Sequence, residues 1–405
     1  MGQLSHIRVL DLSRVLAGPW AGQILADLGA DVIKVERPGA GDDTRGWGPP
    51  FLRDQSGAET GEAGYFLAVN RGKRSVTVSL DKPEGQAIIR ELAARSDIVL
   101  ENFKAGTLAR YRLAYEDLKA VNPKIIYCSV TGFGQSGPRR DQAAYDFMIQ
   151  AMGGLMSITG ERDGKPGGGP QKVGLPIVDL MSGMYAAVSV LAALANREAT
   201  GQGVYIDVAM LDVMVSTLSN QAMNYLVSGV VPKRTGNAHP NIQPQDVFAC
   251  SDGAMAVAVG NDSQFRKFCD VLGMPELAAD ERFAKNASRV RNLATLRPLL
   301  DQRLRQKTRN EWVSALDIAG VPAGPINTIP EVFEDPQVKF RGMVSEGPHP
   351  LSGTVPRIGS PMRFGDVAAP QTRPPPLLGE HNLEVFREMG FSDEKLASLK
   401  SLGAI

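Results

Sequence analysis

The chain has 405 residues, of which 43% are hydrophobic and 22% are charged. That length predicts more than one domain, and the composition is typical of a soluble globular protein. The 44 basic and 44 acidic residues cancel, which excludes a general attraction to nucleic acid or to an anionic membrane surface. Any anion-binding site must therefore be local.

The cysteines and the first residues indicate a cellular compartment. Cys128, Cys250 and Cys269 are far apart and odd in number, so they predict neither a disulfide framework nor a metal site. The opening segment MGQLSHIRVLDLS lacks the basic and apolar regions of a signal peptide. We therefore expect a cytoplasmic protein with no bound metal and no membrane partner.

The first 150 residues alternate between strand and helix patterns. Strands are expected at 6–13, 31–38, 75–80, 97–103 and 124–130, and helices at 18–30, 82–97 and 113–123. Such alternation predicts an α/β fold with a parallel sheet covered by helices on both faces. No G-x-G-x-x-G motif follows the first strand, so the layout alone does not indicate a nicotinamide or flavin cofactor.

A single acid, Asp179, stands at the head of an apolar run. Residues 180–195 are about sixteen in number, fewer than the roughly twenty that a membrane-spanning helix needs. We expect a buried helix that begins near Pro176. Asp179 is then either an ordinary N-cap or a functional carboxylate. The glycine-rich segment 160–174 before it is either a surface turn or a mobile cover.

The functional alternative for Asp179 has a clear chemical basis. A carboxylate with a reference pKa of about 3.9 is ionised at neutral pH and needs no general base to act as a nucleophile. Water weakens it by solvation, so a shaped and dry site restores its reactivity. Its natural target is an activated acyl group. Attack on a thioester would give a mixed anhydride and a free thiolate.

The pattern changes from about residue 225. Residues 247–260 predict a β-hairpin around a Ser-Asp-Gly turn, and a helix follows Asn261. Basic residues are frequent in the helical segment 282–309, including Arg289, Arg291, Arg297, Arg303 and Arg305. We interpret them as a solvated helix face; a nucleic-acid surface is a remote alternative, because no aromatic residues are interleaved.

Several motifs in a fixed order resemble one known family. They include VLDLSRVLAGPWAGQILADLGADVIKVERP, DIVLENFKAGTLARY, VGLPIVDLMSGMYAAVSVLAAL and, near the end, PPPLLGEHN. Together they resemble the family III CoA-transferases, which include formyl-CoA transferase and carnitine CoA-transferase. The resemblance implies an interlocked homodimer, each subunit having a large open Rossmann-like domain from both chain ends and a small inserted α/β domain. The expected boundaries are 1–225, 226–325 and 326–405.

The resemblance also implies a mechanism and a binding site. Asp179 would carry first the acyl group as an anhydride and then CoA as a thioester, while a small carboxylic acid accepts the CoA. No prosthetic group is implied, because coenzyme A is a substrate. Carried over residue by residue, the CoA site would comprise Leu16, Ala17, Arg37, Val78, Ser79, Leu80, Asp81, Asn102, Phe103, Lys104, Arg110, Gln142, Ala143, Ala144, Tyr145 and Asp146.

Two departures narrow the expected activity. Formyl-CoA enzymes carry a glutamine at the position of Leu16, so a leucine argues against formyl-CoA or oxalate as substrates. The related 2-methylacyl-CoA racemases carry His-Asp where this chain has Tyr145-Asp146, and tyrosine is a poor proton shuttle at neutral pH. Transferase is therefore favoured over racemase.

Other points stay open at this stage. Weak candidates for contact with the acceptor acid are Gly236, Asn237 and His239. The donor is expected to be an acyl-CoA, with succinate as one plausible acid. A CoA-binding protein without catalysis is a third alternative. The sequence does not decide whether Arg139 and Arg140 contact CoA or solvent.

Overall fold

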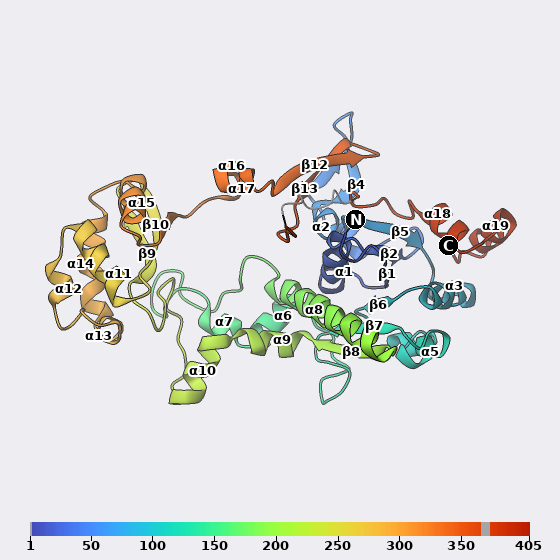
Figure 1. Cartoon of the computed structure of the whole chain (residues 1–405), viewed down its shortest axis with the longest axis horizontal. Coiled ribbons are helices and arrows are strands. Elements are labelled where there is room, and N and C mark those ends of the chain that lie inside the picture. Colours follow the sequence, from blue (N-terminus) through green and yellow to red (C-terminus); the bar gives the residue numbers. More distant parts are fainter. Residues whose placement is uncertain (1, 366–372) are drawn as a thin grey trace. The chain divides into compact units, whose positions relative to one another are not determined.

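The computed structural model describes residues 2–365 and 373–405, and these fall into two compact units (Figure 1). Unit 1 comprises residues up to Gly154, then Gly174–Ala222 and the chain from Gln337 onward. Unit 2 comprises Leu155–Val173 and Met223–Pro336. The range 226–325, expected as a small domain, lies within unit 2, which also contains most of the glycine-rich segment 160–174.

A six-stranded parallel sheet forms the centre of unit 1, with the spatial order β5-β2-β1-β6-β7-β8. Its strands are β1 (Arg8–Asp11), β2 (Asp31–Glu36), β5 (Lys73–Thr77), β6 (Ile98–Glu101), β7 (Ile126–Thr131) and β8 (Val204–Ala209). The order reverses between β1 and β6, as in doubly wound dinucleotide-binding folds. The predicted α/β fold with a parallel sheet is confirmed.

Helices cover both faces of this sheet (Figure 1). One face is covered by α3 (Pro83–Ala94), α5 (Tyr115–Val121), α18 (Asn382–Glu388) and α19 (Asp393–Ser401), whose apolar side chains share a core with alternate strand residues. The other face is covered by α1 (Ala17–Asp27) and α8 (Ile177–Thr200). Both ends of the chain therefore build the same unit.

Helices α1 and α8 lie in close contact because one residue of α8 is glycine. A Cβ atom on Gly183 would lie 2.6 Å from the carbonyl oxygen of Ala17, much closer than such atoms approach. This packing brings the first turn of α8 beside the first turn of α1. Asp179 lies one turn before Gly183, so the packing also fixes where Asp179 is placed.

Helix α8 is long and apolar enough to cross a membrane by length and composition, the one such helix in the described chain. It is instead packed along one face on α1, β7 and β8. The prediction of a buried helix is correct for that face only, because Met184, Tyr185 and Val188 are exposed. The apolar run continues on both faces, so its composition alone could not show which one is covered.

Shorter elements complete unit 1. They are η1 (Asp43–Gly46), β3 (Phe51–Arg53), β4 (Glu59–Ala63), α2 (Gly64–Val69), α4 (Thr107–Arg110), α6 (Asp146–Met152), α9 (Met210–Thr217), β12 (Val344–His349) and β13 (Gly353–Ile358). Two further helices, α10 (Ser219–Ser228) and α17 (Pro336–Phe340), each extend across a boundary between the two units. β3 pairs with β4 and β12 with β13, both antiparallel.

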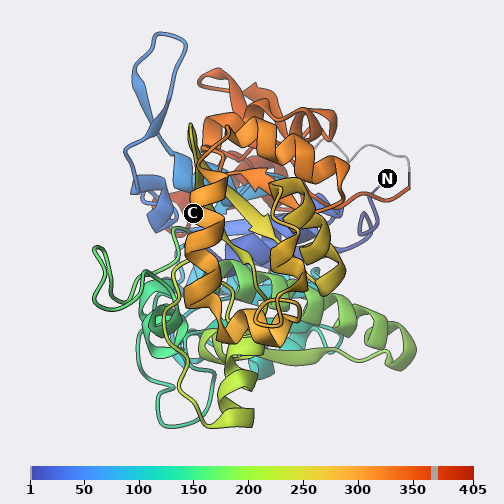
Figure 2. The same ribbon diagram turned by 90° about the vertical axis from the view of Figure 1, so that its left-hand side faces the viewer.

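Unit 2 has its own antiparallel sheet and core (Figure 2, yellow to orange). The predicted hairpin is confirmed as β9 (Gln245–Cys250) and β10 (Gly253–Ala258), with β11 (Ala323–Pro325) beside β10. The helices are α7 (Leu155–Ile158), α11 (Asp262–Leu272), α12 (Glu276–Ala279), α13 (Asn286–Arg291), α14 (Leu293–Leu304), α15 (Arg309–Ile318) and α16 (Ile329–Glu334). Asn261 caps α11, as predicted, by accepting a hydrogen bond from the Gln264 amide.

One residue of the basic segment does not lie on a solvated face, so that interpretation was wrong for it. Arg289 is fully buried. Its guanidinium pairs with Asp262 at 2.9 Å and donates to the carbonyl oxygens of Gln243 and Phe283. It also lies over the ring of Phe265. Arg291 and Arg305 are exposed, as expected. A local pattern cannot separate these cases, because the buried acceptors come from other segments.

We predict that Arg289→Ala lowers the free energy of unfolding of unit 2 by about 3 kcal/mol or more, since it leaves two carbonyl oxygens without their donor and removes one cationic partner of Asp262. Arg291→Ala changes an exposed arginine two residues later, and it should change the free energy of unfolding by less than about 0.5 kcal/mol. Urea unfolding followed by the fluorescence of Trp312, which lies in unit 2, measures both. Equal effects of the two variants would contradict the assignment.

Candidate active site

The carboxyl ends of the six parallel strands lie at one edge of the sheet, and the segments that follow them line two cavities. Segments after β1 and β6, on either side of the point where the strand order reverses, contribute Leu16 and Asn102. Segments after β2 and β5 contribute Arg37 and Ser79. Ligands of doubly wound sheets bind at this place in general. The cavities therefore lie where the fold itself favours a ligand.

The larger cavity, of about 250 Å³, contains Asp179. Nine predicted CoA-site residues line it with Asp179: Leu16, Ala17, Asn102, Phe103, Lys104, Gln142, Ala143, Ala144 and Tyr145. Three cationic side chains, Arg14, Lys104 and Arg140, line the same space. Of the two arginines left open between CoA and solvent, Arg140 lines this cavity.

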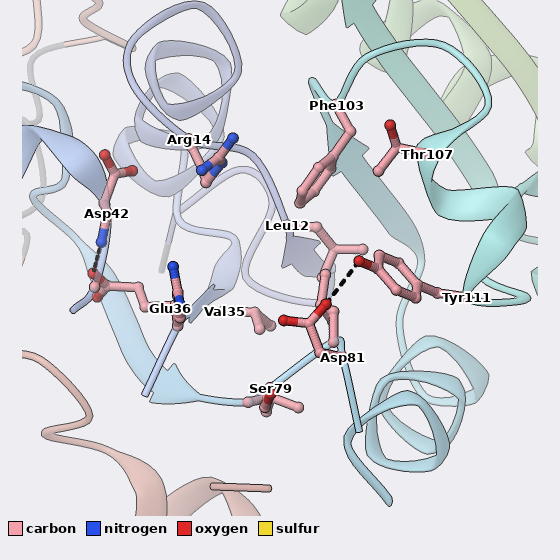
Figure 3. Close-up of a pocket in the computed structure, with 14 residues that line it drawn as sticks. Leu12, Arg14, Val35, Glu36, Asp42, Ser79, Asp81, Phe103, Thr107 and Tyr111 are labelled. Carbon is pink, nitrogen blue, oxygen red and sulfur yellow. Dashed lines mark hydrogen bonds between the residues drawn. The ribbon is translucent and has the colours of Figure 1, made fainter. Parts of the chain in front are cut away.

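The smaller cavity, of about 150 Å³, collects most of the remaining predicted residues (Figure 3). Its lining includes the predicted Arg37, Val78, Ser79, Leu80, Asp81 and Phe103. The hydroxyl of Tyr111 donates to the Asp81 carboxylate at 2.8 Å, which closes one side. Arg14 and Phe103 line both cavities, so the two spaces adjoin.

The structure does not bring every predicted residue into these cavities. Arg110, at the end of α4, is exposed and lines neither of them. Asp146 is buried behind the wall rather than in it. Gly236, Asn237 and His239 belong to unit 2, where Nδ1 of His239 accepts hydrogen bonds from the amides of Asn241 and Ile242.

Asp179 is not the N-cap of its helix, so that explanation of its position is wrong. Pro176 occupies the N-cap, and its side chain makes no capping hydrogen bond. The cap comes from Asp146 on α6, which accepts from the amides of Val178 at 2.7 Å and Asp179 at 3.3 Å. The Asp179 side chain is thereby left free of the capping role, and it lines the cavity.

The charge state of Asp179 also differs from the expectation. Burial and, secondly, the negative charge of Asp146 raise the pKa of Asp179 to about 7. The group is therefore only partly ionised at neutral pH, because a carboxylate held away from water beside another carboxylate resists ionisation. Burial and the charges of Asp179 and Asp146 likewise raise the pKa of Tyr65 to about 12, so this tyrosine keeps its proton.

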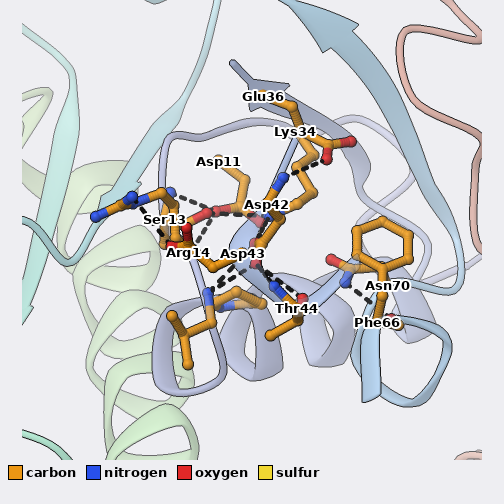
Figure 4. Close-up of polar contacts among 12 residues, drawn as sticks. Asp11, Ser13, Arg14, Lys34, Glu36, Asp42, Asp43, Thr44, Phe66 and Asn70 are labelled. Atoms are coloured by element: carbon orange, nitrogen blue, oxygen red, sulfur yellow. Dashed lines mark hydrogen bonds and ion pairs between the residues drawn. The ribbon is translucent and has the colours of Figure 1, made fainter. Parts of the chain in front are cut away.

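A network of buried charges supports the loop that follows β1 (Figure 4). The ammonium of Lys34 donates to the Asp42 carboxylate at 2.8 Å and to the Ser13 carbonyl at 3.0 Å. Asp42 also accepts from the amide of Val15 at 3.2 Å, a residue held at a φ of 70°. This network fixes the backbone just before Leu16, at the wall of the larger cavity.

The same network keeps Asp42 charged. Although burial alone would raise the pKa of Asp42, Lys34 and the amide and hydroxyl of Thr44 lower it to about 2. A second buried pair joins Lys73 to Asp11 at 2.9 Å. Lys34 is paired with Asp42 and Lys73 with Asp11, so these four groups fix the geometry of the loop and are not free to act as catalytic groups.

A third cavity of about 560 Å³, almost entirely apolar, lies on the other side of Leu16. Tyr65, Pro176, Leu180 and Met184 line it, so it adjoins the start of α8. No group of three or more histidine, cysteine, aspartate or glutamate side chains suited to a metal ion occurs among the described residues.

Sequence reasoning missed several residues of the site. Arg14 and Tyr111 line the cavities, and Tyr65 lies near Asp179 from α2. Thr131, the last residue of β7, and Gly132, the next residue, line the larger cavity. The position of those two could have been inferred, because they directly follow a predicted strand of the parallel sheet. No local signal marks Tyr65, which reaches the site only through the fold.

Residues 4–382 of the chain match CoA-transferase family III. The chain belongs to this family. This family III CoA-transferase is 48% identical to the succinate–glutarate CoA-transferase of Agrobacterium fabrum, over 95% of each chain. It is 41% identical to the succinyl-CoA:glutarate CoA-transferase of Homo sapiens, over 99% of this chain and 90% of the human protein.

A solved structure agrees with this assignment. The crystal structure of a CaiB/BaiF family protein from Brucella suis matches this family III CoA-transferase with a TM-score of 0.83 and 49% identity, covering 96% of this chain and 100% of the other. The chain is therefore a transferase whose substrates are CoA thioesters.

We predict that Asp179→Asn makes the protein more stable than the wild type at pH 8, by about 4 kcal/mol. With a folded-state pKa of about 7, Asp179 is protonated in the folded state but ionised in the unfolded state between about pH 4 and pH 7. The wild type thus loses stability relative to the variant as pH rises through that window, and the difference levels off above it.

Urea unfolding of both proteins from pH 4.5 to 8.5 measures this difference directly. Leu180→Ala, which removes an uncharged neighbour, is the matched control and should shift stability equally at every pH. A difference between Asp179→Asn and the wild type that does not vary with pH would show that Asp179 titrates normally.

Proposed function

We propose that this chain moves CoA from succinyl-CoA to a second carboxylic acid, with Asp179 as the carrier. The observation that carries the proposal is that Asp179 lines one cavity together with nine of the residues expected to bind CoA. The named activities of the relatives from Agrobacterium fabrum and Homo sapiens support a dicarboxylate on each side of the exchange.

The charges in the site suit CoA. Arg14, Lys104 and Arg140 in the larger cavity and Arg37 in the smaller one provide partners for phosphate oxygens, and arginine can bind them with two parallel hydrogen bonds. The apolar side chains of Val78, Leu80 and Phe103 would accommodate the adenine in the smaller cavity (Figure 3). The thioester end would then extend toward Asp179.

The proposed reaction exchanges one activated acyl carbon for another. An Asp179 oxygen attacks the succinyl carbonyl, the carbon–sulfur bond breaks, and CoA leaves as a thiolate, giving a mixed anhydride. The thiolate attacks the Asp179 carbonyl and releases succinate. The acceptor carboxylate then attacks the aspartyl thioester, the carbon–sulfur bond breaks, and CoA leaves again as a thiolate, which gives a second anhydride. Attack of the thiolate on the acceptor's acyl carbon finally forms the new CoA thioester and restores Asp179.

The racemase alternative receives less support. Proton transfer at the α-carbon needs a base that changes its charge near neutral pH, and histidine is suited to that role. Tyr145 occupies the position at which the racemases have this histidine, and it lines the cavity with Asp179. No histidine occurs among the described residues that line this cavity.

We expect that hydroxylamine added to the enzyme with succinyl-CoA converts Asp179 to a hydroxamate, because an anhydride or thioester of aspartate is open to that nucleophile. Peptide mass spectrometry detects the product. Asp179→Asn should abolish it and lower turnover at least about 1000-fold. Asp212→Asn, which changes an exposed aspartate of α9, is the matched control. An unmodified Asp179 with several acyl-CoA donors would argue against the mechanism.

We also propose that the enzyme is a homodimer. Exposed apolar side chains on neighbouring helices α6 and α8 support this proposal, since a face of this kind is usually covered. They are Phe147, Met148, Met152, Met184, Tyr185 and Val188.

Light scattering measured as the protein elutes from a size-exclusion column should therefore give twice the mass of the chain. Val188→Asp should shift the enzyme toward the monomer, because it places a charge in the middle of that face. Val204→Asp makes the same substitution at an exposed valine on β8 and should leave the mass unchanged. A monomeric wild type would contradict the proposal.

A further inference from the structure

We propose that Asp146 is a positioning residue for the transfer reaction, which both fixes the backbone of the carrier Asp179 and favours its acylated state. The inference rests on the proposed function of Asp179. It differs from a role in binding CoA, which the resemblance suggested for this position. The geometry of α6 and the first turn of α8 carries it.

Both oxygens of the Asp146 carboxylate are occupied by protein donors. Oδ1 accepts from the amides of Val178 and Asp179, and Oδ2 accepts from the side-chain amide of Gln150 one turn later in α6. The carboxylate is buried, with 8% of the residue exposed. It is therefore directed at the nucleophile's own backbone and not at the cavity.

This bond replaces a cap that α8 cannot make for itself. The first amides of a helix need acceptors, and Pro176 at the N-cap has no side-chain acceptor to offer. Asp146, 33 residues before Asp179, supplies it from another helix. The position of the Asp179 carboxyl group relative to the cavity thus depends on Asp146.

The negative charge of Asp146 has a second effect. Free Asp179 and Asp146 form a like-charged pair in a poorly solvated place, which disfavours the ionised form of Asp179. Acylation makes Asp179 neutral and transfers its charge to the CoA thiolate, because the carbon–sulfur bond breaks with both electrons on sulfur. The repulsion is then relieved. Asp146 therefore shifts the equilibrium from the free carboxylate toward the anhydride.

Other ionisable groups around Asp179 do not replace this effect. Tyr65 faces it from α2 and stays neutral, since its pKa is raised to about 12 by burial and by the two carboxylates. Arg14, Lys104, Arg140, Asp43 and Tyr145 line the same cavity. Burial and Asp146 alone account for the raised pKa of Asp179.

Asp146→Asn and Asp146→Ala separate the two effects. The asparagine keeps an oxygen that can accept from both amides but removes the charge. In this asparagine variant, the pH profile of the rate at which Asp179 is acylated should have its midpoint about one pH unit lower than in the wild type. The fraction of Asp179 trapped by hydroxylamine above pH 8 should fall about tenfold. The alanine also removes the cap and should lose about a further tenfold in acylation rate.

Asp117→Asn is the matched control, because Asp117 caps α5 in the same unit by accepting from the amide of Ala114. It should change neither the pH midpoint nor the trapped fraction. A purely structural cap at Asp146 would make its asparagine variant behave in the same way. That result, with normal trapping in the wild type, would overturn this inference and leave the proposed function intact.

Two further outcomes are decisive. Absence of trapped Asp179 in the wild type would overturn both proposals together. If neither Asp146 variant folds, carbon-13 NMR of aspartate-labelled wild type decides, with the Asp179 signal identified by its loss in Asp179→Asn. That signal should titrate near pH 7, and titration near the ordinary value of about 4 would overturn the inference.

Discussion

All strands of the large sheet run parallel, and this single constraint determines where the active site can be. Parallel pairing places six carboxyl ends at one edge, and the segments leaving that edge must turn across it before entering a helix. Those turns supply Leu16, Asn102 and Ser79 to adjoining cavities. A site assembled from distant pieces of sequence thereby follows from the pairing of strands.

Buried charge makes these turns rigid. A loop after a strand has few neighbours to hold it. The loop after β1, however, is held by hydrogen bonds from its backbone to the buried side chains of Lys34 and Asp42. Burying such a pair costs solvation, and its retention here goes with a fixed loop geometry. A cavity wall that is already rigid lowers the entropic cost of binding a flexible substrate, because the protein has little conformational freedom left to lose.

The position and charge state of Asp179, the proposed carrier, depend on both packing and electrostatics. Gly183 allows α8 to approach α1, and Asp146 holds the amides at the start of α8. This arrangement raises the pKa of Asp179, so its carboxyl group is only partly ionised at neutral pH. A carboxyl group of this kind suits the proposed role of acyl carrier, because in the proposed reaction it would spend part of the cycle as a neutral anhydride or thioester. Reactivity in this site thus arises from the surroundings of Asp179 more than from its own acidity.

The sequence by itself determined the alternation of strands and helices, the parallel sheet and the helix that begins before Asp179. Each depends on local periodicity or on residues adjacent in the chain. With the family motifs, it also located about half of the residues that line the two cavities. Most of those positions come shortly after a strand of the parallel sheet, but it was the resemblance of the motifs, and not local periodicity, that identified them.

Only the tertiary structure decided which charges are buried and which group caps α8. Arg289 and Arg291 are alike in sequence, but only the first meets acceptors from other segments. The sequence offered Asp179 as a possible N-cap of α8, yet Asp146 performs that role from another helix. Hydrogen bonds and pKa values depend on groups brought together across the chain, and no local pattern encodes those distances.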